Sequence, residues 1–206
     1  MKLYSAISVL ALAAAPAFAS AATSGFLIDF EKSWAYGETV DSTYASSGVT
    51  FTNVLGLSNG DGLGALPNGD YYANAPTPLG TASAQLDGVV NTTSFMNVAD
   101  GVNGALSFFY SSPVALTGAI KAYSGLNGTG TLLGTFDLVA NTSAYDVWTP
   151  VTFNFVGTAQ SFDLTGTANV AGLDNISAVP EPETAPLALI GLALPLAMAA
   201  IRRRRA

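Results

Sequence analysis

The chain has 206 residues, a formal net charge of −7, and neither histidine nor cysteine. The missing residue types exclude serine-histidine and cysteine-histidine catalysis, disulfides, a lipid anchor on cysteine, and the usual zinc, iron-sulfur and haem sites. Between Thr23 and Val179 two lysines stand against twelve acids, a net charge of −10, which repels nucleic acid and anionic lipid. The balance favours divalent cations or neutral, hydroxyl-rich partners; a charged coat for solubility is the alternative.

The N-terminus has the pattern of an export signal. Lys2 precedes a mostly apolar run from Ala6 to Ala15, and Ala17-Phe18-Ala19 is a small-x-small cleavage box. We therefore predict a signal peptide over residues 1–19, in which a short signal helix is removed by signal peptidase. Cleavage after Ala21 fits equally well.

Residues 20–178 form one predicted domain with a β pattern almost throughout, because short Val, Thr, Phe and Tyr runs alternate with turn residues. In the first strand, Phe26 to Glu31, the apolar side chains share one face, and Asp29 and Glu31 share the other. The chain from Leu57 to Leu79 is expected to be a long loop that contains Tyr71 and Tyr72. The other strands expected in this half are Val49–Thr52, Ser83–Val89, Phe95–Val98 and Ala105–Tyr110.

The second half is the more regular. A hairpin is predicted from Leu116–Tyr123 and Thr131–Val139 around the turn Asn127 to Gly130. Further strands are expected at 151–155, 161–164 and 173–178. About ten strands without helices predict an all-β fold, an antiparallel two-sheet sandwich of the jelly-roll kind.

Three kinds of side chain in this domain are candidates for chemistry or binding. Asp29 and Glu31 have the spacing for a carboxylate-dependent glycosidase, although acids at i and i+2 are common on strand surfaces. The oxygen-rich loop from Asn59 to Asp70 is a candidate for calcium, without the spacing of a known calcium loop. Aromatic residues that could stack on sugars are Trp34, Tyr36, Tyr71, Tyr72 and Trp148, with Tyr71 and Tyr72 favoured because they fall in a loop.

The last stretch, residues 179–206, has three parts in a fixed order. Pro180-Glu181-Pro182 holds the backbone extended and free of regular pairing. An apolar segment follows and predicts a short transmembrane helix over residues 186–201. Arg202, Arg203, Arg204 and Arg205 then keep the end of the chain cytoplasmic by the positive-inside rule. The preceding domain is therefore expected on the outer side of the membrane.

This tail resembles the PEP-CTERM sorting signal of Gram-negative envelope proteins, on the match Val179-Pro180-Glu181-Pro182-Glu183-Thr184, the apolar helix and the arginine cluster. The resemblance implies that an exosortase, a membrane protease and transferase, reads and removes the tail. It also implies transient anchoring in the inner membrane, followed by a place at the cell surface or in the extracellular matrix. A permanent single-pass anchor is the alternative.

Residues 104–178 are similar in layout to the jelly-roll ectodomains found on PEP-CTERM proteins, through their glycines, the run Val151 to Phe155, and Leu173-Asp174-Asn175-Ile176. These ectodomains resemble carbohydrate-binding modules, in which a structural calcium commonly joins the first strand to the last. If this carries over, the ligands are expected among Asp29, Glu31 and Asp174. An alternative role for Asp174 is a hydrogen bond to the backbone at the start of a strand.

These expectations together describe an exported, non-enzymatic protein with a structural or adhesive role in the cell envelope or exopolysaccharide matrix. Its expected partners are exosortase, signal peptidase and extracellular polysaccharide, with no nucleic acid. A carbohydrate-binding module is the first alternative, and the carboxylate-dependent glycosidase is a distant third.

Overall fold

The computed structural model describes residues 25–58 and 74–178. Within these residues nine strands are joined by loops and three short 3-10 turns, and no longer helix is present. The strands are β1 (Phe26–Ile28), β2 (Val49–Thr52), β3 (Val54–Ser58), β4 (Gly80–Ala84), β5 (Phe95–Ser111), β6 (Leu116–Tyr123), β7 (Leu132–Leu138), β8 (Thr149–Asp163) and β9 (Gly172–Ala178). The 3-10 turns are η1 (Ala45–Ser47), η2 (Leu126–Gly128) and η3 (Thr165–Thr167).

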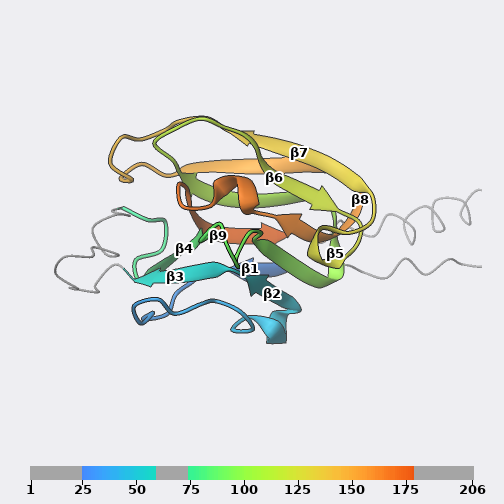
Figure 1. Cartoon of the computed structure of the whole chain (residues 1–206), viewed down its shortest axis with the longest axis horizontal. Helices are drawn as coiled ribbons and strands as arrows, with labels where there is room; N and C mark the ends of the chain where they lie inside the picture. Colours follow the sequence, from blue (N-terminus) through green and yellow to red (C-terminus); the bar gives the residue numbers. More distant parts are fainter. Residues whose placement is uncertain (1–24, 59–73, 179–206) are drawn as a thin grey trace, which may run out of the picture.

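All strand pairs are antiparallel and form one hydrogen-bonded network (Figure 1). The strand order is β3-β4-β9-β5-β8-β6-β7, with β1 added to β9 and β2 added to β5. The prediction of an all-β antiparallel fold is therefore confirmed.

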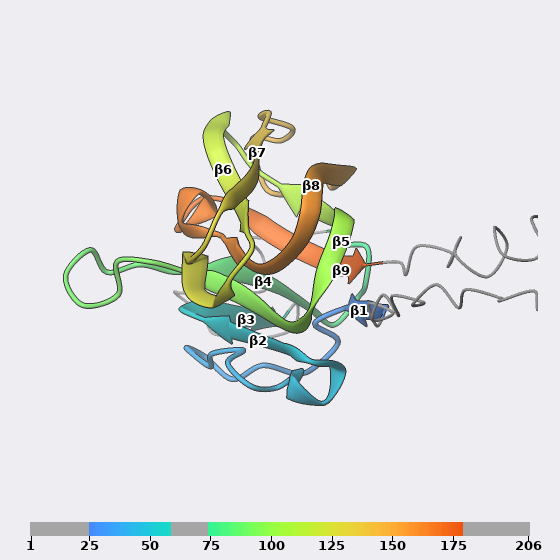
Figure 2. The same cartoon turned by 90° about the vertical axis from the view of Figure 1, so that its right-hand side faces the viewer.

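The network folds over into two layers because β5 and β8 pass through both. The first part of β5 pairs with β2 and with the end of β8, whereas its last part pairs with β9 and with the start of β8. Between the two parts the register shifts, and Gly101 and Gly157 have φ values of 75° and 94°. Because such values favour glycine, the strands can turn there from one layer into the other. Figure 2 shows both strands as strongly curved ribbons.

The core lies between the layers and is rich in aromatic rings. Phe153 packs against Phe136, Phe155 and Phe162, with ring centroids 5.4 to 6.5 Å apart. Near the first strand, Phe30 contacts Tyr44 and Phe51, both with centroids 5.8 Å away. Since alternate strand residues point to opposite faces, these rings cover the inner face of each layer and leave polar residues outside.

Several element boundaries differ from the sequence prediction. β1 ends at Ile28, because Phe30 has a left-handed backbone (φ 53°) and ends the pairing. β5 and β8 are each one long strand, whereas the pattern predicts two. β3 lies partly in the segment expected to be a loop. β4 begins three residues before the predicted strand Ser83–Val89 and shares Ser83 and Ala84 with it; the rest of the predicted strand forms a turn at Asp87.

The two ends of the described domain lie side by side. β1 pairs with β9 in the register Phe26 with Ala178 and Ile28 with Ile176. The predicted signal peptide, the transmembrane helix and the tail lie outside the described residues. Within the described ranges, no helix is long and apolar enough to cross a membrane.

Candidate cation site at the junction of the first and last strands

Four residues meet where β1, β4 and β9 come together: Asp29, Glu31, Thr77 and Asp174, named here the β1–β9 junction. β9 pairs with β4 at Leu173 and with β1 from Ile176 onward, so Asp174 falls in the gap between its two neighbours on that side. The turn after β1 and the segment before β4 fill this gap. The strand pairing thus brings together three segments that are far apart in the sequence: the turn after β1, the segment before β4, and β9.

Asp174 is fully buried and takes hydrogen bonds from two residues. Its Oδ1 accepts from the Asn175 backbone N–H at 2.7 Å, and its Oδ2 accepts from the Thr77 backbone N–H at 3.3 Å. The Thr77 hydroxyl also lies 3.0 Å from Asp174 Oδ2 and 3.2 Å from Asp174 Oδ1. The strand-opening role considered for Asp174 is therefore present, as a bond to the next N–H.

The Thr77 hydroxyl is shared between two acceptors. It lies 3.0 Å from the Asp29 carbonyl oxygen and 3.0 Å from Asp174 Oδ2. A hydroxyl has a single proton and can satisfy one acceptor at a time, so the Asp29 carbonyl loses this donor whenever the hydroxyl turns to Asp174, whose Oδ2 also accepts the Thr77 backbone N–H. Carboxylate, carbonyl and hydroxyl oxygens are the ligands that calcium prefers, and a cation bound there would satisfy them together.

Glu31 has a separate role at the same place. Its Oε1 accepts the backbone N–H groups of Leu79 and Gly80, at 2.8 and 3.1 Å, and thereby holds the start of β4. The Asp29 carboxylate accepts the Glu31 N–H at 3.2 Å. The two side chains predicted to share one strand face thus flank a turn instead, because β1 ends before them.

Burial and neighbouring negative charge raise two pKa values at the junction. Burial raises the pKa of Asp174 to about 7, with the Glu31 charge adding to the rise and the bonds from Asn175 and Thr77 opposing it. Burial raises the pKa of Tyr44 to about 12, with the charges of Asp29, Asp174 and Glu31 contributing. Burial is the largest cause of both shifts, and neighbouring negative charge adds to it.

The nearby lysine is engaged elsewhere. Lys32 pairs with Glu38 and lies 4.5 Å from the centre of the Trp34 ring. Across the described ranges, no three His, Cys, Asp or Glu side chains form a group that could hold a metal ion by themselves. The oxygens that fit a cation are therefore mixed: the Asp174 carboxylate, the Asp29 carbonyl and the Thr77 hydroxyl, with Glu31 close by.

Trp34 fixes the chain that follows the junction. Its ring is buried, its Nε1 donates to the Phe30 carbonyl at 2.9 Å, and its backbone N–H donates to Ser58 Oγ. An added Cβ on Gly56 would lie 2.0 Å from the ring, so only glycine allows the ring to lie flat against β3. The interpretation of Trp34 as an exposed sugar platform is wrong.

The remaining predicted residues fall into two groups. Tyr36 is 59% exposed, and Trp148 is half-buried. Outside the described residues lie the glycan candidates Tyr71 and Tyr72, the loop from 59 to 70, the motif Pro180, Glu181 and Pro182, and the arginines Arg202, Arg203, Arg204 and Arg205.

Sequence reasoning missed Thr77 and Tyr44. Thr77 stands between Pro76 and Pro78, which favour an extended backbone, and this is the one local signal of its position. Tyr44 carries no local signal, because its place beside the acids depends on packing against Phe30 and Phe51.

Comparison with known proteins gives distant likeness in fold. No protein-family model and no curated protein matches the chain. Among solved structures, the K2 cleaved adhesin domain of Lys-gingipain is 13% identical, with 75% of this chain and 99% of that chain covered and a TM-score of 0.47. The K1 domain from Porphyromonas gingivalis W83 is 12% identical over 77% and 99%, also with a TM-score of 0.47. CBM35 from Paenibacillus barcinonensis is 17% identical over 65% and 94%, with a TM-score of 0.39. At these values no site or ligand is carried over.

Proposed function

We propose that the chain is an exported, non-enzymatic protein with a structural or adhesive role in the cell envelope or exopolysaccharide matrix of a Gram-negative bacterium. The observation that carries the proposal is the order of the parts in residues 179–206: Pro-Glu-Pro motif, apolar segment, arginine cluster. An exosortase reads and removes this tail after signal peptidase has removed residues 1–19. Within this tail, the Pro-Glu-Pro motif distinguishes a sorting signal from a plain membrane anchor, which needs no such motif.

The folded domain supports this role through the position of its ends. Because Phe26 pairs with Ala178, both connections leave the domain at one edge, where β1 and β9 run side by side (Figure 2). A domain attached at that edge turns its opposite loops away from the attachment point. One of these is the loop between β4 and β5, on the side opposite β1 in Figure 2, where Val89 and Val90 are 84% and 82% exposed. This arrangement suits a protein that displays a surface rather than one that encloses a substrate.

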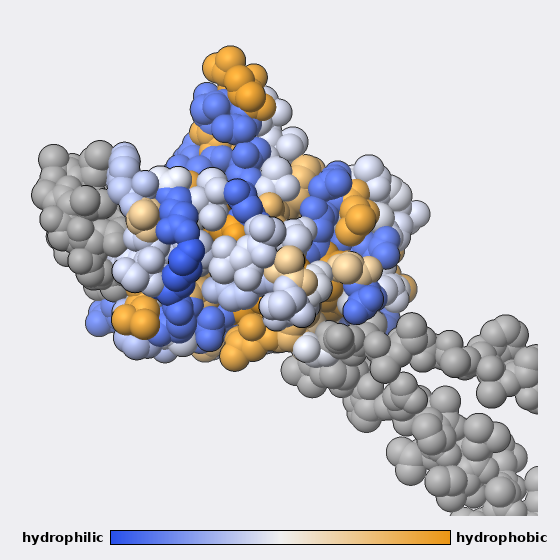
Figure 3. All heavy atoms as spheres, turned by 90° about the horizontal axis from the view of Figure 1, so that it is seen from below, coloured by the Kyte–Doolittle hydropathy of each residue, from blue (hydrophilic) through white to orange (hydrophobic). Residues whose placement is uncertain are grey.

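The outer surface agrees with a soluble, displayed domain. Seen from below, hydrophilic and hydrophobic residues are interspersed, and no broad hydrophobic area covers this face (Figure 3). The excess of acids over lysines disfavours binding to nucleic acid and to anionic lipid.

A glycosidase receives little support from the acids. Asp174, whose pKa is raised into the range of a general acid, is fully buried and cannot reach a sugar. Glu31 and Asp29 are engaged by backbone N–H groups. These contacts hold the backbone together.

We propose that the same β1–β9 junction holds a structural calcium. Its ligands are the Asp174 carboxylate, the Asp29 carbonyl, the Thr77 hydroxyl and Glu31.

The intact mass of the mature protein, recovered from cells with and without exosortase activity, tests the sorting proposal. We expect a product that ends between Pro180 and Thr184 only when exosortase is active. A Pro182→Ala variant should remain unprocessed, whereas a Pro186→Ala variant, which changes a proline outside the motif, should be processed normally. A product that still carries Arg202 to Arg205 in both strains would identify the tail as an ordinary anchor.

A further inference from the structure

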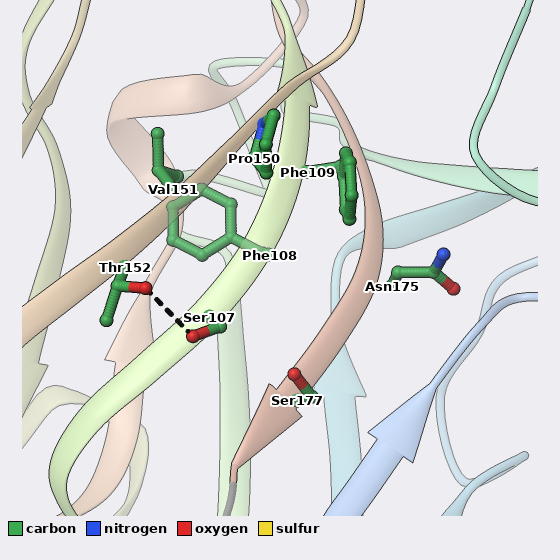
Figure 4. Close-up of a pocket in the computed structure, with 8 residues that line it drawn as sticks. All are labelled: Ser107, Phe108, Phe109, Pro150, Val151, Thr152, Asn175 and Ser177. Atoms are coloured by element: carbon green, nitrogen blue, oxygen red, sulfur yellow. Dashed lines mark hydrogen bonds between the residues drawn. The ribbon is translucent and has the colours of Figure 1, made fainter.

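A shallow groove of about 310 Å³ crosses the outer face of β5, β8 and β9. It lies on the face that does not pack against the other layer, and it adjoins the β1–β9 junction through Asn175, whose backbone N–H donates to Asp174. Its lining residues are Ser107, Phe108, Phe109, Pro150, Val151, Thr152, Asn175 and Ser177 (Figure 4). Phe108 is buried in the core, so its neighbours Ser107 and Phe109 point outward.

The strand register sets hydroxyl groups in a row across this groove. Ser107 on β5 is opposite Ser177 on β9 and opposite Thr152 on β8. The Ser107 and Thr152 hydroxyls are 3.0 Å apart and hydrogen-bonded (Figure 4). Three neutral groups that can each donate and accept therefore follow one another across three strands.

A partly exposed aromatic ring stands beside this row. Phe109 is opposite Pro150 on β8, and on its other side lies the irregular step of β9 at Asp174 and Asn175. Figure 4 shows the Phe109 ring between Pro150 and Asn175. An aromatic face next to hydroxyl groups can stack against an apolar ring surface while the hydroxyls bond to its polar edge.

Asn175 adds an acceptor that lacks a donor. Its backbone is left-handed (φ 48°), and its side-chain Oδ1 is buried without a hydrogen-bond partner among the described residues. A buried unpaired acceptor costs free energy that a bound hydroxyl or N–H donor would recover. Because Oδ1 is shielded from solvent, a ligand donor reaches it only when the Asn175 side chain rotates toward the groove.

We propose that this groove binds a neutral polysaccharide, with one sugar ring stacked on Phe109, its hydroxyls bonded to Ser107 and Thr152, and the Asn175 amide rotated to accept a further hydroxyl. No charged side chain is among the lining residues, and the acidic domain repels polyanions, so the ligand is uncharged. The groove is a shallow surface across neighbouring strands, so it suits internal sugars along a polysaccharide chain rather than the sugar at the chain's end. The biological setting rests on the proposed matrix role, but the binding chemistry does not depend on the tail.

Affinity electrophoresis of the exported protein through gels containing dextran, galactomannan, hydroxyethyl cellulose or alginate tests this inference. We expect at least one neutral polymer to retard the protein and the anionic alginate not to do so. Phe109→Ala should weaken the retarding interaction about tenfold or more, and Phe109→Trp should retain it. Leu132→Ala, which removes a half-exposed apolar side chain on β7, outside the groove lining, is the matched control and should bind normally.

Thr152→Arg provides a second variant that does not depend on Phe109. Thr152 is exposed, so the arginine can be accommodated without disturbing the core, and it should obstruct the groove and abolish retardation. Retardation unchanged in Phe109→Ala and Thr152→Arg, or absent for every neutral polymer in the wild type, would overturn the inference. A dimer in solution that Phe109→Ala converts to a monomer would assign the face to a second copy instead. None of these outcomes bears on tail processing, which the mass measurement decides separately.

Discussion

Asp174 carries a carboxyl group into a fully buried position beside Glu31 and Asp29, where the described residues supply hydrogen bonds but no cation. If calcium occupies the β1–β9 junction, it should stabilise the folded state by about 2.7 kcal/mol at a hundredfold excess over its Kd. For a domain of this size, at roughly 2 to 4 °C per kcal/mol, we expect the melting midpoint to rise by roughly 5 to 11 °C between EDTA and calcium. Asp174→Asn should abolish the shift, whereas Asp100→Asn, at an exposed position, should retain it. Equal midpoints in calcium and EDTA for the wild type would exclude the site.

The same carboxyl group predicts a pH dependence in the cation-free protein. Because the pKa of Asp174 is about 7 in the folded state and near 4 in the unfolded chain, the folded state holds a proton that the unfolded chain has lost. The free energy of unfolding should therefore fall between about pH 4 and about pH 7 and level off above, by roughly 2 to 4 kcal/mol. Urea titrations in EDTA measure it. Asp174→Asn should flatten this slope, because an amide stays neutral throughout, and an unchanged slope would assign the dependence to other groups.

Trp34 links β3 to the chain beside this junction, because its ring lies against β3 and its Nε1 donates to the carbonyl of Phe30. Gly56→Ala would place a methyl group 2.0 Å from the ring and displace it, so we expect a loss of about 3 kcal/mol of stability. Chemical denaturation measures the loss. The control is a double-mutant cycle with Trp34→Leu, whose smaller side chain leaves room for the methyl group. The combined cost should be well below the sum of the single costs; simple additivity would show that the close contact is not the cause.

At the scale of elements, the sequence predicts what depends on alternation and misses what depends on pairing. The bounds of β2 and β6 agree with the pattern: β2 alternates along its whole length, and β6 alternates from Ile120 to Tyr123. β5 and β8 were each predicted as two strands, since glycines interrupt the pattern where the strands in fact bend between layers. β4 was placed too late, because Ser83 to Val89 has strand-forming composition but Asp87 Oδ1 accepts three successive backbone N–H groups and ends it in a turn.

The candidate site shows the same division. Asp29, Glu31 and Asp174 could be connected only through a resemblance to domains that join their first and last strands, and the structure does bring their segments together. Thr77 could not be connected, because its place follows from the path of the chain before β4. The groove likewise depends on the register of three strands, which no local pattern specifies.

At the scale of the whole molecule, β5 and β8 belong to both layers, so neither layer can separate while the other stays paired. We therefore expect unfolding in urea to be a single cooperative transition. Far-UV circular dichroism reports all strands, whereas tryptophan fluorescence reports Trp34 beside β3 and Trp148 just before β8, and the two curves should coincide. Leu106→Ala, in the core part of β5, should cost about 2 to 5 kcal/mol and shift both curves together. Val156→Ala, on β8 but 83% exposed, is the control and should change stability by less than about 0.5 kcal/mol. Two separate transitions, or a Leu106→Ala shift in one signal alone, would mean that the layers unfold independently despite the strands they share.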